Sequence, residues 1–158
     1  SAEPVNTIDF SPAEKEYARL HEIRTRKVTG GLRPHVVRHK IQKACSTCMG
    51  IIREKDKLEA AAKELARIRQ EDMPNMIVSD QSPTYNIEWK EAIEAYNLLD
   101  LAELAVNATL MREESRGQYL RPDFPQKDDA NWKCMLVGRL KNGQITFEKK
   151  TMPEVTQW

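Results

Sequence analysis

The sequence lacks the glycine patterns that hold nucleotides. Its six glycines form neither a G-x-G-x-x-G dinucleotide fingerprint nor a Walker phosphate loop. The G-x-S-x-G elbow of the α/β-hydrolases is also absent. These absences exclude the two commonest nucleotide cradles and the nucleophile elbow of the α/β-hydrolases.

Long apolar runs and an even set of cysteines are missing as well. No stretch approaches the roughly 20 apolar residues of a membrane span, and residues 1–17 lack the basic and apolar regions of a signal peptide. The three cysteines, an odd number, fit a reducing compartment better than a secreted disulfide scaffold. The expected location is therefore the cytoplasm.

An excess of charge of one sign is absent too. Charged residues make up 31% of the chain, yet the formal net charge is only +1. A nucleic-acid-binding domain usually presents a basic face, so this balance argues against nucleic acid as the main partner. The locally basic stretches 21–27 and 32–40 are better explained as solvated helix faces.

What the sequence does contain is helical periodicity. Ser11, Pro12 and Glu14 form a capping box at a helix start, and Asn86 is a second plausible cap. Glycines at 30, 31 and 117 are expected stops. The four predicted helices cover residues 11–30, 33–53, 54–72 and 86–117.

The C-terminal part has a different pattern. The β-rich stretches 133–140 and 143–150 flank Asn142-Gly143, a hairpin turn signal. We therefore predict a mainly α fold, an antiparallel up-and-down bundle of about three long helices, with a C-terminal β-hairpin. Its parts would be an extended lead-in over 1–10, the bundle over 11–118 and a proline-pinned tail over 119–158. An isolated hairpin is marginal in water, so it should pack on another surface.

One segment carries more charge than a helix end requires. The run "MREESRGQYLRPDFPQKDDANW", residues 111–132, combines adjacent glutamates, three arginines, two prolines and an Asp-Asp pair. Arg112 and Arg116 suit the C-terminal end of a helix dipole, whereas Glu113 and Glu114 do not. The glutamates should therefore have either specific partners or solvent.

This segment resembles the C-terminal signature of the succinate dehydrogenase/fumarate reductase flavoprotein family, which includes L-aspartate oxidase. The family pattern is an Arg, then Glu-Ser-Arg-Gly, then Arg-x-Asp-x-Pro and an Asp-rich turn before Trp. The upstream Gly50-Ile51-Ile52-Arg53 step and the long helix after it extend the likeness over about 33–135. The family's His after Glu-Ser-Arg-Gly is missing, and nearby positions hold Gln118 and Tyr119. The matching residues are Arg112, Glu114, Ser115, Arg116, Gly117, Arg121, Asp123, Pro125, Asp128, Asp129 and Trp132.

The resemblance implies a helical C-terminal domain of a larger FAD-dependent oxidoreductase. FAD would be bound upstream, so this chain would hold no cofactor and would not be catalytic alone. Its partners would be the flavin-binding and capping domains and an iron–sulfur subunit, with membrane association only through the parent complex. The residues expected to dock onto those domains are Arg112, Glu114, Ser115, Arg116, Arg121 and Asp123. A stand-alone helical interaction module is the competing hypothesis.

Two smaller motifs have a chemical and a structural explanation. Cys45 and Cys48 form a C-x-x-C, and His35 and His39 are one helical turn apart. A zinc site would need two further ligands beside the cysteines, from Cys134 and the histidines. Buried cysteines on a helix face and solvated histidines are the favoured interpretation, so no metal site is expected.

Overall fold

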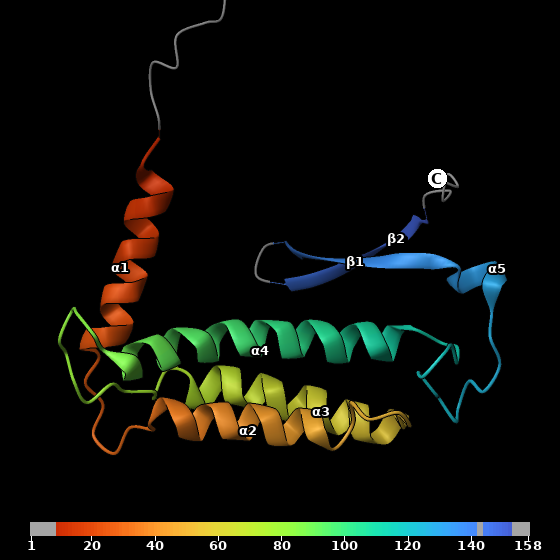
Figure 1. The fold of residues 1–158 in the computed structure, drawn as a ribbon, viewed down its shortest axis with the longest axis horizontal. Coiled ribbons are helices and arrows are strands. Elements are labelled where there is room, and N and C mark those ends of the chain that lie inside the picture. Colours follow the sequence, from red (N-terminus) through yellow and green to blue (C-terminus); the bar gives the residue numbers. More distant parts are fainter. Residues whose placement is uncertain (1–8, 142–143, 153–158) are drawn as a thin grey trace, which may run out of the picture.

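The computed structural model describes residues 9–141 and 144–152, and it is mainly helical with a two-stranded hairpin. The central helices α2, α3 and α4 run side by side in alternating directions, α1 stands away from one end of them, and the hairpin lies along α4 (Figure 1). The predicted fold class is confirmed. The elements are α1 (Ser11–Thr25), α2 (Pro34–Ser46), α3 (Lys55–Arg67), the π-helical turn η1 (Ile68–Asp72), α4 (Ile87–Met111), α5 (Asp129–Trp132), β1 (Cys134–Lys141) and β2 (Gln144–Thr151).

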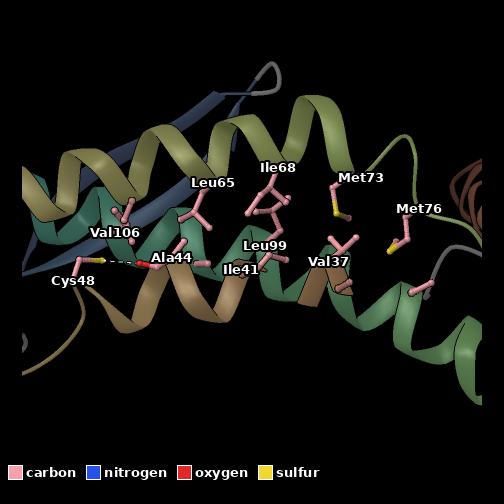
Figure 2. Packing of buried hydrophobic residues seen from close by; sticks show 14 of the residues in the cluster. Val37, Ile41, Ala44, Cys48, Leu65, Ile68, Met73, Met76, Leu99 and Val106 are labelled. Atoms are coloured by element: carbon pink, nitrogen blue, oxygen red, sulfur yellow. Dashed lines mark hydrogen bonds between the residues drawn. The ribbon is translucent and has the colours of Figure 1, made fainter. Parts of the chain in front are cut away.

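The hydrophobic core lies between α2, α3 and α4. Figure 2 shows side chains of the three helices and of the segment after η1 pointing into one interior. Buried residues recur every three or four positions, which places them on one face of each helix. The buried residues of α4 include the alanines Ala92, Ala95 and Ala102. The core includes Val37, Ile41, Ala44, Cys48, Leu58, Leu65, Ile68, Met73, Met76, Ala92, Ala95, Leu99 and Val106.

Helix α1 differs from its prediction at both ends. Ser11 is the first helical residue rather than the cap, and its backbone N–H and hydroxyl both donate to Asp9. The helix ends at Thr25, before the glycines. Gly30 instead occupies a turn with φ +72°. A Cβ atom added to Gly31 would lie 2.8 Å from the carbonyl oxygen of Asn75, so the absence of a side chain at Gly31 allows the two backbones to approach closely.

The prediction that the second helix continues through Gly50 to Arg53 is wrong. Helix α2 ends at Ser46, and the hydroxyls of Ser46 and Thr47 donate back to carbonyl oxygens one turn earlier. Such bonds compete with helix continuation. Residues after the helix pair with the C-terminal segment instead: Leu120 N–H donates to Ile51 O at 3.0 Å, and Arg53 N–H donates to Leu120 O at 2.8 Å.

Helix α4 begins as predicted and ends early. Asn86 caps it, because its side-chain oxygen accepts a hydrogen bond from Trp89 N–H at 2.8 Å. The helix stops at Met111 instead of Gly117. Gly117 lies in a tight turn with φ +58°, where Arg116 and Tyr119 exchange backbone hydrogen bonds. This turn returns the chain to the end of α4.

Replacing Asn86 with alanine should lower the free energy of unfolding by about 1–2 kcal/mol, because the α4 cap is lost. Asn97 provides a matched control, since it is an exposed asparagine inside the same helix. Asn97→Ala should change stability by no more than about 0.5 kcal/mol. Urea unfolding followed by circular dichroism measures both variants. Equal midpoints for the two would contradict a stabilising cap.

The hairpin pairs β1 with β2 in antiparallel register, with Val137 opposite Glu148. Gly138 faces α4. A Cβ atom added to Gly138 would lie 2.1 Å from Cδ1 of Leu104 on α4 and 3.3 Å from Cε1 of Phe147, its partner on β2. The hairpin therefore packs on the long helix, as its marginal intrinsic stability requires. The predicted turn at Asn142-Gly143 lies outside the described residues, as does the predicted lead-in apart from Asp9 and Phe10.

Candidate functional site

The candidate site is the segment after α4, residues 112–132, which we call the signature segment. Its centre is the carboxylate of Glu114, which is fully buried. Arg116 donates to it through Nε at 2.8 Å and Nη2 at 2.9 Å, the Asp128 backbone N–H donates at 3.0 Å, and Arg112 also donates. Burial opposes ionisation, but these donors outweigh it and the pKa of Glu114 is lowered.

Arg121 is a second buried charge, and its side chain caps the C-terminal end of α4. Its side chain is 1% exposed and forms a bidentate pair with Asp123 at 2.8 and 2.5 Å. Its Nη1 donates to the carbonyl oxygens of Thr109 at 2.6 Å and Arg112 at 3.3 Å. The last carbonyls of a helix have no partner within it. Arg121 therefore satisfies them and places positive charge at the negative end of the helix.

Ser115 fixes the path of the chain around Arg121. Its hydroxyl accepts from Arg121 N–H at 2.8 Å and is within donor distance of Phe124 O at 2.9 Å. Its backbone N–H donates to Gln126 O at 3.1 Å. The signature segment is thus a closed loop with satisfied polar groups, despite its high charge.

Trp132 joins the signature segment to the hairpin. The indole ring is 6% exposed, with the Arg112 guanidinium 5.5 Å from its centroid and Lys149 Nζ of β2 at 3.4 Å. Arg112 also donates to the carbonyl oxygens of Trp132 at 3.1 Å and Cys134 at 3.0 Å. One arginine therefore connects Glu114, the tryptophan and the first residue of β1.

Tyr119 lies near the position where the family pattern has histidine. Its hydroxyl donates to Thr109 O at 2.8 Å, and burial raises its pKa. Arg53 stacks over its ring, with the guanidinium carbon 4.6 Å from the centroid. Sequence reasoning noted Arg53 only as part of a motif step. Its place beside the signature segment depends on the backbone pairing between Ile51 and Leu120.

The six predicted docking residues are brought together, but their exposure differs. The side chains of Arg112, Arg116 and Asp123 are 19%, 34% and 29% exposed. Glu114, Ser115 and Arg121 are buried, so in this conformation they contact the chain's own atoms. The docking role stays a prediction.

In the part of the chain that the structure describes, the cysteines and histidines of the smaller motifs do not gather into a metal-binding cluster. Within 9–141 and 144–152, no three His, Cys, Asp or Glu side chains gather in a metal-binding arrangement. Cys45 and Cys48 are free thiols, and burial raises the pKa of both. A raised pKa reduces the thiolate fraction on which redox exchange depends. His35 and His39 are exposed on α2.

The fold and the signature segment are those of a mainly helical domain with a two-stranded hairpin, and comparisons with known proteins show its family. A family model described as the fumarate reductase flavoprotein C-terminus matches residues 38–157, and the chain belongs to this family. The fumarate reductase flavoprotein subunit of Mycobacterium tuberculosis strain H37Rv is 34% identical over 148 residues, which is 92% of this chain and 25% of that protein. The succinate dehydrogenase flavoprotein subunit of Rickettsia bellii is 28% identical over 98% of this chain and 26% of its own length.

Solved structures agree with this assignment. Mycobacterium smegmatis Sdh1, in complex with UQ1, aligns over 99% of this chain and 26% of that chain with a TM-score of 0.84 and 25% identity. Escherichia coli quinol fumarate reductase FrdA shares the fold with a TM-score of 0.82 at 21% identity, over 98% of this chain and 27% of that chain. The chain thus spans about a quarter of the length of its relatives. Among the described residues, no helix combines the length and the apolar character of a membrane span.

Proposed function

We propose that the chain is the C-terminal helical domain of an FAD-dependent oxidoreductase, which it supports without holding the cofactor itself. It would buttress the flavin-binding and capping domains and offer a surface to an iron–sulfur subunit. The proposal rests on the share of each chain that the match covers. The match spans 92% of this chain but only 25% of the mycobacterial subunit. The same proposal places the chain in the cytoplasm, held at a membrane only through its parent complex.

The exposed apolar side chains support a covered surface in the parent. Helix α1 buries only Ile23, and Phe10 and Tyr17 are 63% and 71% exposed. An isolated helix of 15 residues is marginal in water, so α1 gains stability from an additional packing partner. Ile51 beside the signature segment and Leu101 on α4 are 68% and 63% exposed as well.

The six signature residues would serve docking in two ways. Arg116 and Asp123 keep part of their side chains in solvent, so they can form ion pairs with another domain. Lys127 and Arg116 lower the pKa of Asp129 to about 2, so that carboxylate is also ionised on the same surface. Arg112, Glu114, Ser115 and Arg121 would hold the segment in the shape that is presented.

The size of the native polypeptide tests this function. An antibody against the chain should detect a species about four times larger than 18.2 kDa in source cells, since the chain covers 25% of a related subunit. That species should co-purify with flavin absorbance. The recombinant 158-residue chain serves as the size marker.

A native band at 18.2 kDa would separate the remaining explanations. If it co-purifies with a flavin-bearing polypeptide, the domain is a separately encoded subunit with the proposed role. If it runs without flavin, the proposal fails and the stand-alone interaction module takes its place.

A further inference from the structure

Beside the signature segment lies a cleft of about 450 Å³, which we call the Arg53 cleft. It is bounded by the end of α4, the loop that carries Arg53, the Tyr119 turn and the beginning of β1. The proposed docking residues Arg112 and Arg116 belong to its lining, whereas the docking proposal gives no role to Arg53 or Lys133. Its lining consists of Arg53, Ala108, Thr109, Arg112, Arg116, Tyr119, Trp132, Lys133, Cys134, Leu136 and Met152.

The charges that line the cleft do not balance. Among the described residues, four that line the cleft are cations and none is an acid. Within the described part of the chain, the carboxylates paired with them are Glu114 and Asp129, and Asp129 is shared with Lys127. Two positive charges remain in excess, and a concave surface of one sign concentrates ions of the opposite sign.

Arg53 is the cation that the structure holds most firmly without an acidic partner. Its Nε donates to Gly50 O at 3.0 Å, its Nη1 donates to Thr109 Oγ1 at 3.2 Å, and its guanidinium stacks on Tyr119. No carboxylate within residues 9–141 and 144–152 forms an ion pair with it. A guanidinium has five N–H donors, so the Nη1–Nη2 edge keeps donors for a ligand.

The remaining walls favour a carboxylate attached to an apolar body. Trp132, Leu136 and Met152 supply apolar surface next to the cationic edge. A planar carboxylate matches two parallel N–H donors of one guanidinium. The cleft also lies at the C-terminal end of α4, whose partial negative charge disfavours a dianion such as phosphate.

We propose that the Arg53 cleft binds a carboxylate group, with the Arg53 guanidinium as its main ligand and Lys133 adding long-range attraction. The carboxylate has two possible sources. One is an acidic side chain of the flavin-bearing part of the parent protein, and this source rests on the proposed function. The other is a free short-chain carboxylic acid, which does not.

The first experiment titrates the 158-residue chain with sodium acetate and sodium butyrate, with sodium chloride holding the ionic strength constant. The Trp132 indole Nε1–Hε1 signal in a ¹⁵N NMR spectrum, which every variant retains, should shift and saturate, and butyrate should bind more tightly than acetate because of the apolar walls. Arg53→Gln should weaken binding at least about tenfold, the loss expected for hydrogen bonds to a charged group. Arg139→Gln is the matched control, because Arg139 is an exposed arginine with only a 3.7 Å ion pair.

Because Arg53 also contacts its own chain, Lys133→Gln provides a second variant. The side chain of Lys133 is exposed and forms no ion pair with a described residue, so its loss should leave the circular dichroism spectrum unchanged. It should weaken butyrate binding by a smaller factor than Arg53→Gln.

A second arm measures association of the same variants with the flavin-bearing polypeptide by sedimentation velocity. If Arg53→Gln weakens that association and free acids do not bind, the source is a protein side chain. If butyrate binds at Arg53 and the wild-type chain does not associate, the cleft is established and the proposed function fails. Wild-type behaviour of Arg53→Gln in both arms would overturn the cleft proposal, as would equal binding of chloride and butyrate.

Discussion

Arg121→Ala is expected to lower the free energy of unfolding of the chain by about 3 kcal/mol, the lower end of the cost of removing one partner from a buried ion pair, because Arg121 is buried while Asp123 is 29% exposed. The 1%-exposed guanidinium is bound to Asp123 and to carbonyl oxygens at the end of α4. Its removal takes the bidentate donor from the Asp123 carboxylate and leaves the Tyr119 hydroxyl as the remaining side-chain donor to the carbonyl oxygens of Thr109 and Arg112. Urea unfolding at pH 7, fitted to two states, measures the difference.

Arg139→Ala is the control for this variant. Arg139 lies exposed on β1, 3.7 Å from Glu148, with both side chains more than half exposed. Surface pairs of this kind contribute about 0–1 kcal/mol, so its loss should scarcely move the midpoint. A loss below about 1 kcal/mol for Arg121→Ala would contradict this prediction. It would mean that water replaces the guanidinium, so that the burial of Arg121 contributes little to the free energy of unfolding.

The predictions that held depended on signals local in sequence. Asn86 was identified as a cap because an asparagine before an apolar-periodic stretch satisfies a free N–H of the first turn, and that bond is present at 2.8 Å. The hairpin followed from two β-rich stretches around a turn signal, and the strands pair as expected. In both cases, the residues that determine the local structure are only a few positions apart in the sequence.

The failed prediction for the end of α2 depended on contacts distant in sequence. Helix α2 ends at Ser46 because residues 51–53 pair with Leu120, nearly seventy positions later. Periodicity in residues 33–53 carried no information about that strand-like pairing. The same pairing positions Arg53 beside Tyr119, so the Arg53 cleft could not be predicted from spacing either.

Burial of charge was the further difference between sequence and structure. The family resemblance predicts Glu114 and Arg121 as docking residues, which in the isolated chain would be exposed or paired among themselves. Their partners are nearby in the chain, Arg116 and Asp123 two positions away, and a backbone that folds back on itself closes both pairs. The signature therefore groups these residues correctly, while only coordinates distinguish the buried members from the exposed ones.

Glu114→Gln should produce the second large loss of stability, about 3 kcal/mol at pH 7, since it leaves Arg112 and Arg116 around a neutral side chain. The glutamine amide would also present N–H donors to groups that are themselves donors. Glu113→Gln is the control, because Glu113 is the adjacent residue and is exposed. It should cost no more than about 0.5 kcal/mol. Similar losses for both variants would show that the effect is not specific to the buried carboxylate.

The pH dependence of the Glu114→Gln loss gives a stricter test. The folded pKa of Glu114 lies below its ordinary value, because its donors outweigh burial. A carboxylate with a lowered folded pKa contributes its full stability above the unfolded pKa, about 4.3, and loses it as pH falls through the folded pKa. The difference between wild type and Glu114→Gln should therefore stay constant from pH 7 to about 5 and shrink on further acidification. A difference that persists unchanged to pH 2 would show that the side chain acts through its shape rather than its charge.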